Sequence, residues 1–146
     1  MSLKLEHQLC FALYTASRRI IKMYHPMLSE LQLTYTQYIT MLALWSKDGQ
    51  TVSELGAMLS LDSGTLTPLL KKMESMALLK RVRSAADERN VEIILTDVGK
   101  NLKHKASGIP GRIASCVPLN IEEAMVLHRL LKKITDLPAD QTCVVE

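Results

Sequence analysis

The chain has 146 residues, 47% hydrophobic, 23% charged and only 4% aromatic, a composition that excludes a disordered protein and favours a mainly helical fold. No apolar run reaches the roughly 20 residues that span a bilayer, and the N-terminus lacks the apolar segment of a signal peptide, so we expect a cytoplasmic protein without a membrane partner. The net charge of +3 is concentrated between residues 71 and 89, a segment that contains six basic and three acidic residues. Such a concentration of positive charge is expected for binding phosphates.

The first predicted helix has apolar residues at every third or fourth position from 5 to 24, the spacing of one helix face. Pro26 is expected to end or kink this helix. A second helix is expected after Thr34, because Thr34 and Gln37 have the spacing of a capping box, and Gly49 should close it.

Two further helices are predicted in the middle of the chain. Thr51 and Glu54 form a second capping box, which opens a short helix. A longer helix begins after a cap at Asp62 or Ser63 and is expected to run to about Met76. The pair has the layout of a helix-turn-helix.

The apolar period then changes from helical to two. The segments 79–83 and 91–95 alternate as strands do, and the residues between them are polar. This pattern predicts a two-stranded hairpin with a charged tip. Thr96 can cap the next helix, which should bend at the sequence GIPG (residues 108–111), and Asn120 with Glu123 opens the last helix.

This order of elements predicts a mainly α fold with a small β-hairpin wing, a winged helix-turn-helix in a single domain of residues 1–146. We expect residues 34–96 to form the DNA-binding lobe, and 1–33 and 97–146 to form dimerisation helices, whose apolar faces have no partner in so small a motif. The expected partners are therefore a second copy of the chain and double-stranded DNA with a pseudo-palindromic operator.

Short hydroxyls near the start of the second helix of the motif can reach phosphates and base edges, although each of them is also an ordinary helix-capping residue. In the hairpin, Arg89 is flanked by acidic residues and is either an exposed ion-pair partner or a minor-groove probe, and we favour the second role. The predicted DNA-binding residues are Asp62, Ser63, Thr65, Thr67, Lys71, Lys72, Arg83, Asp87 and Arg89.

Three segments together resemble the MarR family, and specifically its organic-hydroperoxide sensors, the OhrR-type repressors. They are LDSGTLTPLLKKME, KRVRSAADERNVEIILTDVGK and LEHQLCFALYTASR, and the similarity runs from about residue 5 to residue 131. The resemblance implies a repressor with DNA contacts on the helix from Asp62 and on Asp87 and Arg89. Ala77 departs from the glycine usual in the family. Because alanine in a left-handed helix cap costs about 1 kcal/mol, a reshaped turn is expected there.

Cys10 lies on an apolar helix face, where a cysteine is more often a small core residue than a reactive one. Tyr14 shares that face, and the resemblance adds Tyr24 and Tyr35 as partners of the reactive sulfur. Tyr24 is about 21 Å along the helix from Cys10, so these groups can meet only across a dimer. Phenolic hydroxyls that donate to a thiolate lower its pKa, and the thiolate attacks peroxides.

The resemblance implies that oxidation of Cys10 by an organic hydroperoxide, the expected inducer, releases the DNA. Three cysteines at wide spacing do not suggest a disulfide framework. Cys116 is a possible resolving cysteine from the other subunit, Cys143 lies in a polar C-terminal tail, and capping by a small thiol remains an alternative.

Other functions remain open at this stage. A MarR-type regulator that senses a phenolic or other small ligand, with Cys10 not sensing, is the first alternative. A thiol peroxidase is a weaker one, because the chain has no C-x-x-C motif and no acid–base constellation. His7 and Cys10 share a helix face, but two potential ligands do not make a metal site. We therefore expect a regulator rather than an enzyme, without metal or cofactor.

Overall fold

The computed structural model describes residues 3–84 and 90–138. The chain divides into two units, Met1–Ala114 and Ser115–Glu146. The first unit contains the sheet and the helix-turn-helix, and the second contains the last helix. The division into a DNA-binding lobe at 34–96 and dimerisation helices at 1–33 and 97–146 is a division by role, and it stays a prediction.

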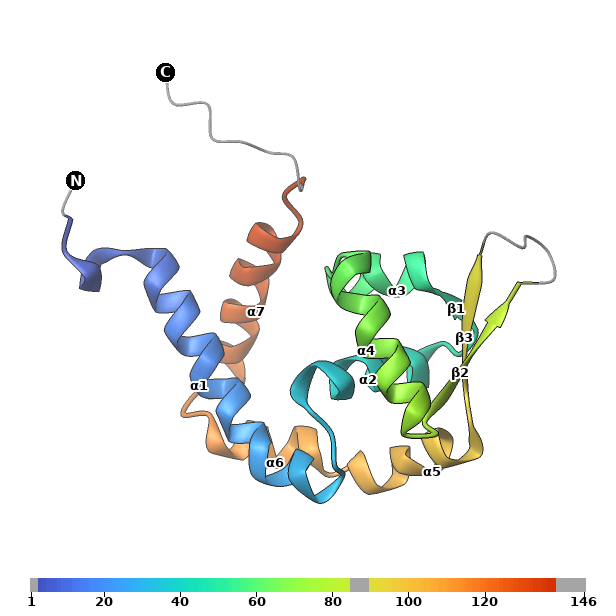
Figure 1. Cartoon of the computed structure of the whole chain (residues 1–146). Coiled ribbons are helices and arrows are strands. Elements are labelled where there is room, and N and C mark those ends of the chain that lie inside the picture. Colours follow the sequence, from blue (N-terminus) through green and yellow to red (C-terminus); the bar gives the residue numbers. More distant parts are fainter. Residues whose placement is uncertain (1–2, 85–89, 139–146) are drawn as a thin grey trace. The chain divides into compact units, whose positions relative to one another are not determined.

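The elements follow one another in the order drawn in Figure 1. They are η1 (Leu5–His7), α1 (Leu9–Glu30), α2 (Tyr35–Ser46), β1 (Gln50–Thr51), α3 (Val52–Leu59), α4 (Ser63–Ser75), β2 (Leu79–Arg83), β3 (Val91–Leu95), α5 (Asp97–Ala106), α6 (Ile109–Cys116) and α7 (Ile121–Thr135). The predicted winged helix-turn-helix is confirmed, with α3 and α4 as its two helices and β2 and β3 as its wing.

Side-chain caps set where several helices begin. At α2 the N–H of Gln37 donates to the hydroxyl of Thr34 and the N–H of Thr34 donates to the side chain of Gln37, at 3.3 and 2.9 Å. The predicted capping boxes at the starts of α3 and α7 are also present. The structure confirms these predicted helix starts. A capping box marks a helix start because its side chains accept from backbone N–H groups that the first helical turn leaves unpaired.

Helix α1 begins later than predicted, and Pro26 does not end it. The residues Leu5–His7 form a short 3₁₀ turn, and α1 begins only at Leu9. At the other end the helix continues past Pro26 to Glu30. A proline removes one helical hydrogen bond, but Met27 and Leu28 directly after it are buried, and their packing holds the last turn in place.

The wing belongs to a three-stranded sheet rather than to a lone hairpin. The two residues of β1 pair with β3, so the strand order is β1-β3-β2. The sequence did not predict β1 because two residues are too short for an alternating pattern. Its Gln50 is buried, and its side-chain amide donates to the carbonyls of Ala43 and Lys47 at 3.2 and 2.8 Å.

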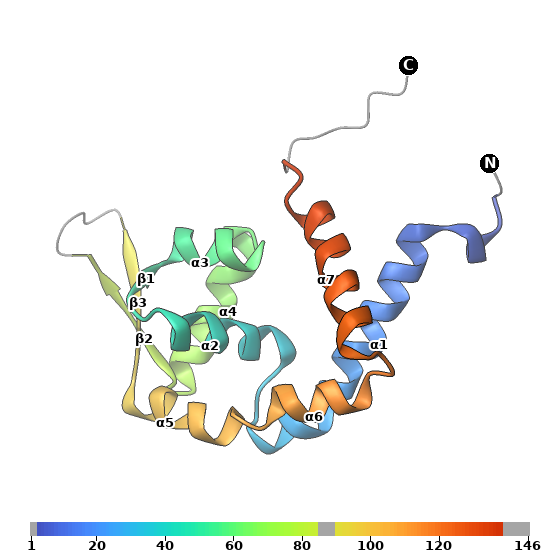
Figure 2. The same cartoon turned by 180° about the vertical axis from the view of Figure 1, so that it is seen from behind.

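The core of the first unit lies where the helix-turn-helix meets the sheet. Figure 1 shows α4 in front of α2, and Figure 2 shows α2 from the opposite side. The side chains that are completely buried in this core come from several elements and are almost all aliphatic: Met41, Leu55, Leu66, Leu70, Met73 and Ile93. This core fixes α4 and the wing on one framework.

The expected bend at GIPG is a break between two helices. Helix α5 ends at Ala106 and α6 begins at Ile109. At the start of α5, Gly99 packs so closely on the Leu78 carbonyl that an added Cβ would overlap its oxygen. The indole N–H of Trp45 donates to the carbonyl of Gly99 at 2.9 Å. Helix α5 is therefore locked against both the wing and α2.

Apolar side chains remain exposed on the helices expected to form the dimer. In the second unit they are Ile121, Met125, Val126, Leu127, Leu130, Leu131 and Ile134, all on α7. On α1, Leu9 is 68% exposed. Such faces are typical of helices that pair with another chain. Within residues 3–84 and 90–138, no helix is long and apolar enough to cross a bilayer.

Candidate functional site

The N-terminus of α4 is organised by Asp62. Its carboxylate accepts from the N–H of Thr65 at 2.9 Å and from the Thr65 hydroxyl at 3.0 Å. These two hydrogen bonds, first of all the one from the backbone, hold the pKa of Asp62 below its usual value. Asp62 is thus the cap, and the hydroxyl of Thr65 belongs to the same cap. Ser63 is exposed and Thr67 is half-buried.

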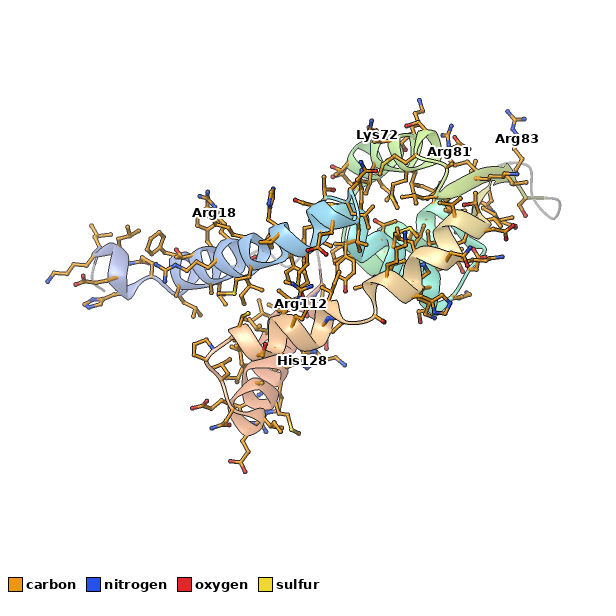
Figure 3. The ribbon with its side chains drawn as sticks, turned by 90° about the horizontal axis from the view of Figure 1, so that it is seen from below. Arg18, Lys72, Arg81, Arg83, Arg112 and His128 are labelled. Atoms are coloured by element: carbon orange, nitrogen blue, oxygen red, sulfur yellow. The ribbon has the colours of Figure 1, made fainter. Side chains whose placement is uncertain are left out.

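Basic side chains follow on α4 and β2. Lys71, Lys72 and Arg83 are exposed. Figure 3 shows Lys72, Arg81 and Arg83 projecting towards the same side of the view. Asp87 and Arg89, which the sequence predicts at the tip of the wing, lie outside the described residues. An exposed helix N-terminus followed by exposed cations is an arrangement that can bind a phosphate backbone.

Sequence reasoning missed the ion pair between Glu74 and Arg81. The carboxylate of Glu74 accepts from both the N–H and the Nε of Arg81, each at 2.9 Å. The hydrogen bond from the Arg81 backbone is the main cause that lowers the pKa of Glu74, and the guanidinium adds to it. The available signal was a glutamate between the lysines of α4 and the basic residues of β2.

The turn between α4 and β2 keeps the shape that a glycine would favour. Ala77 has a φ of 57°, in the left-handed region. Its N–H donates to the carbonyl of Glu74 at 2.9 Å, and the N–H of Leu78 donates to that of Met73 at 3.1 Å. The expected reshaping of this turn is therefore wrong, because these helix-end hydrogen bonds and the buried Leu78 hold Ala77 in the strained conformation.

Three tyrosines form a cluster where α1 meets α2. The rings of Tyr24 and Tyr35 are in T-shaped contact with centroids 5.1 Å apart, and Tyr38 lies 5.8 Å from Tyr24. Burial raises the pKa of Tyr24, and Tyr35 raises it further. The phenol therefore stays protonated and able to donate a hydrogen bond. The sequence did not indicate that Tyr38 belongs to this cluster.

Cys10 and Tyr14 lie near the start of α1, away from that cluster. Cys10 is exposed. The hydroxyl of Tyr14 accepts from Arg18 Nη1 at 3.0 Å, and the guanidinium lies 5.4 Å from the centre of the Tyr14 ring. Arg18 thus holds the Tyr14 hydroxyl through its acceptor oxygen, and the O–H of Tyr14 can still donate.

Cys10 and the tyrosine cluster do not meet within one chain. Cys10 and Tyr24 lie in one continuous helix, about 21 Å apart at 1.5 Å per residue. Cys116, at the end of α6, is exposed and belongs to the second unit. Cys143 lies outside the described residues. Only a second copy of the chain can therefore bring a Cys10 sulfur to the tyrosine cluster.

A mostly apolar pocket of about 310 Å³ adjoins the tyrosine cluster. Tyr38 belongs to both, and Leu42, Trp45, Ala106 and Pro110 supply other parts of the wall. The volume and lining suit a small apolar organic molecule. In the part of the chain that the structure describes, no three His, Cys, Asp or Glu side chains gather as metal ligands.

Comparison with known proteins agrees with this geometry. The family model described as transcriptional regulator SarA/Rot matches residues 22–106. The organic hydroperoxide resistance transcriptional regulator of Bacillus subtilis (strain 168) is 53% identical over 111 residues, which cover 76% of each chain.

Solved structures of AbfR from Staphylococcus epidermidis are also similar. The structure of reduced AbfR bound to DNA has a TM-score of 0.76 and 36% identity, and the match covers 90% of this chain and 92% of AbfR. The structure of disulfide-formed AbfR has a TM-score of 0.64 and 35% identity, with 90% of both chains covered.

Proposed function

Because the chain belongs to the SarA/Rot family of MarR-like transcriptional regulators, we propose that it is a dimeric repressor that leaves its operator when an organic hydroperoxide oxidises Cys10. Membership confirms the resemblance inferred from the sequence and makes the chain a DNA-binding regulator rather than an enzyme. The observation that carries the sensing part is the cluster of Tyr24, Tyr35 and Tyr38, which a Cys10 sulfur can reach only from a second chain.

DNA binding is assigned to α4 and the wing. Helix α4 enters the major groove with its capped N-terminus first, and Ser63, Thr65 and Thr67 lie on its first turns. Lys71, Lys72 and Arg83 contact phosphates. Asp87 and Arg89 act at the tip of the wing, where Arg89 enters the minor groove. The related AbfR has been solved bound to DNA, which supports this assignment.

Sensing is assigned to a site shared by two chains. The exposed apolar faces of α1 and α7 pair the chains. Cys10 of one chain then lies near Tyr24 and Tyr35 of the other, with Tyr14 beside it on its own helix. Phenols that donate to the thiolate lower its pKa and increase the fraction that reacts. A regulator of this kind acts on DNA in the cytoplasm.

The chemistry is a single oxygen transfer. The Cys10 thiolate attacks the outer oxygen of the hydroperoxide, an S–O bond forms as the O–O bond breaks, and the alkoxide leaves as an alcohol after taking up a proton. The sulfenic acid then condenses with the Cys116 thiol of the other chain, which forms a disulfide and releases water. The solved disulfide form of AbfR supports this second step.

The apolar pocket beside Tyr38 favours organic hydroperoxides over hydrogen peroxide. Its wall of Leu42, Trp45, Ala106 and Pro110 can bury an alkyl or aryl group, which hydrogen peroxide lacks. The Bacillus relative is named for resistance to organic hydroperoxides, and this agrees with the chemistry of the pocket.

A mobility shift on a palindromic operator tests the proposal. The reduced protein should shift the DNA, an organic hydroperoxide should release it, and dithiothreitol should restore the shift. Consumption of about one peroxide per chain is expected, because nothing in the mechanism regenerates the thiol. Continuous turnover would instead indicate a thiol peroxidase.

The same pocket supports a second candidate, a regulator released by a small phenolic ligand with Cys10 not sensing. Its apolar wall and its volume of about 310 Å³ suit an aromatic ring. Release of DNA by a phenolic compound without any peroxide, and undiminished in Cys10→Ser, would favour this candidate.

A further inference from the structure

A carboxylate connects α4, the recognition helix that we assign to the major groove, to the wing. Glu74 lies in the last turn of α4, and its two oxygens accept from the backbone N–H and the Nε of Arg81 in β2, each at 2.9 Å. Both side chains are about one-third exposed, at 35% for Glu74 and 31% for Arg81. Because both oxygens bind one residue, Glu74 fixes the orientation of the strand as well as its distance.

These two hydrogen bonds between Arg81 and Glu74, called the brace below, also pair a backbone amide that has no partner within the sheet. Strand β2 lies at the edge of the sheet, and Arg81 is opposite Ile93 of β3. Alternate N–H groups of an edge strand point away from the sheet and need partners elsewhere. The N–H of Arg81 is one of these, and the charged carboxylate of Glu74 is a strong acceptor for it.

Other contacts hold the fold at this corner without the brace. Leu78 and Leu79 are buried. The N–H of Thr96 donates to the Leu78 carbonyl at 3.1 Å, and the Thr96 hydroxyl donates to the Ala77 carbonyl at 2.6 Å. What Glu74 adds is a further connection between the end of α4 and β2, which holds the angle between them more firmly than the core and the short turn do alone.

Arg81 also differs electrostatically from its basic neighbours. Lys72 and Arg83 are exposed on either side of it (Figure 3). The Nε of Arg81 is bonded to Glu74, so its charge is largely offset inside the protein. Lys72 and Arg83 are therefore suited to contact phosphates, whereas Arg81 pairs with Glu74 within the protein.

We propose that Glu74 is a positioning residue for operator recognition, which acts through Arg81 to hold the wing at the angle where wing and recognition helix reach one duplex together. The inference rests on the proposed DNA-binding role. It adds that sequence-specific binding depends on a pair that does not itself touch the DNA.

Glu74→Gln tests the proposal, because glutamine keeps one acceptor oxygen but presents an N–H₂ group to the second donor of Arg81. Operator affinity should fall about tenfold or more, the effect expected for a lost hydrogen bond to a charged group. Affinity for non-operator DNA of the same length should stay equal or rise, since the charge of Arg81 is released. A general folding defect would lower both affinities, so their ratio is the readout.

Arg81→Lys is the second variant, and it keeps the charge and the backbone amide while losing Nε. It should also lower the ratio of operator affinity to non-operator affinity. The variant with both substitutions should have a ratio no lower than that of the single variant with the larger loss. The slope of log affinity against log salt should not change, because no phosphate contact is lost. Glu30→Gln removes an exposed carboxylate from the end of α1 and serves as the control, with an unchanged ratio.

Two results would overturn the proposal. If Glu74→Gln tightens binding to operator and non-operator DNA alike and makes the salt slope steeper, then Arg81 contacts phosphate and Glu74 only masks it. An unchanged ratio in both variants would remove the pair from recognition altogether. Wild-type protein without any operator preference would contradict the proposed function itself, and with it this role of Glu74.

Discussion

Tyr24 of α1 and Tyr35 of α2 meet edge to face, with their ring centroids 5.1 Å apart. Their contact brings two phenol rings from different helices together, next to Tyr38, which lines the apolar pocket. Burial and the neighbouring ring both raise the pKa of Tyr24. The pair is therefore suited to donate hydrogen bonds to an anion that arrives from another chain.

Tyr24→Phe and Tyr35→Phe should bind operator DNA normally in the reduced state and oxidise more slowly. Loss of one donor that lowers the thiolate pKa by one unit slows the reaction by about tenfold near neutral pH. Stopped-flow measurement of sulfenic acid formation checks this. Tyr14→Phe is the matched comparison, because it removes a phenol hydroxyl that lies outside the cluster and accepts from Arg18. Wild-type rates in both cluster variants would show that these phenols do not stabilise the thiolate.

Gly99→Ala should destabilise the protein by about 3 kcal/mol, because the new Cβ overlaps the carbonyl oxygen of Leu78 and neither backbone can move freely. Thermal unfolding of the reduced protein measures the effect. Gly108→Ala is the control, since its added Cβ meets no atom within 4 Å. Equal stabilities of the two variants would contradict the packing described for α5 against the wing.

Arg83→Ala should weaken binding to operator and non-operator DNA to a similar degree. Arg83 is exposed on β2, and removal of one phosphate contact lowers the salt slope by about 1. Lys105→Ala, which removes an exposed cation from α5, is the control. A loss confined to the operator, at an unchanged salt slope, would assign Arg83 a role other than phosphate contact.

Local chemistry made most of the fold predictable from the sequence. The capping boxes at Thr34, Thr51 and Asn120 marked helix starts that the structure confirms. The change of apolar period gave both strands of the wing with their observed ends. Strand β1 was not predicted because Gln50 and Thr51 pair with β3, more than 40 residues away in the sequence. The local sequence pattern does not indicate such a long-range contact.

The sites were less predictable because they depend on tertiary contacts. The sequence indicated Tyr24 and Tyr35 only through a family resemblance, and it missed Tyr38, whose ring packs on Tyr24. The sequence also did not indicate that Arg81, one of the six basic residues between 71 and 89, pairs with Glu74. The pairing with Glu74 follows from the turn at Ala77, whose left-handed backbone brings helix end and strand together.

A reducible cross-link between chains should appear on non-reducing gels after mild treatment with an organic hydroperoxide. Cys10 and Cys116 are both exposed, and a disulfide requires their sulfurs to come within about 2 Å. Cys116→Ser should abolish the cross-link. If the link persists in Cys116→Ser and disappears in Cys143→Ser, the resolving cysteine is Cys143. No link in any form would favour capping by a small thiol.

The response of Cys10→Ser tests the central claim most directly. Serine cannot form a sulfenic acid, and because Cys10 is exposed, the substitution leaves the folded core unchanged. The measurement is a mobility shift on the operator before and after addition of an organic hydroperoxide. Cys10→Ser is expected to bind like the wild type and to stay bound when the peroxide releases the wild-type protein. Release of the Cys10→Ser protein by the peroxide would contradict the account.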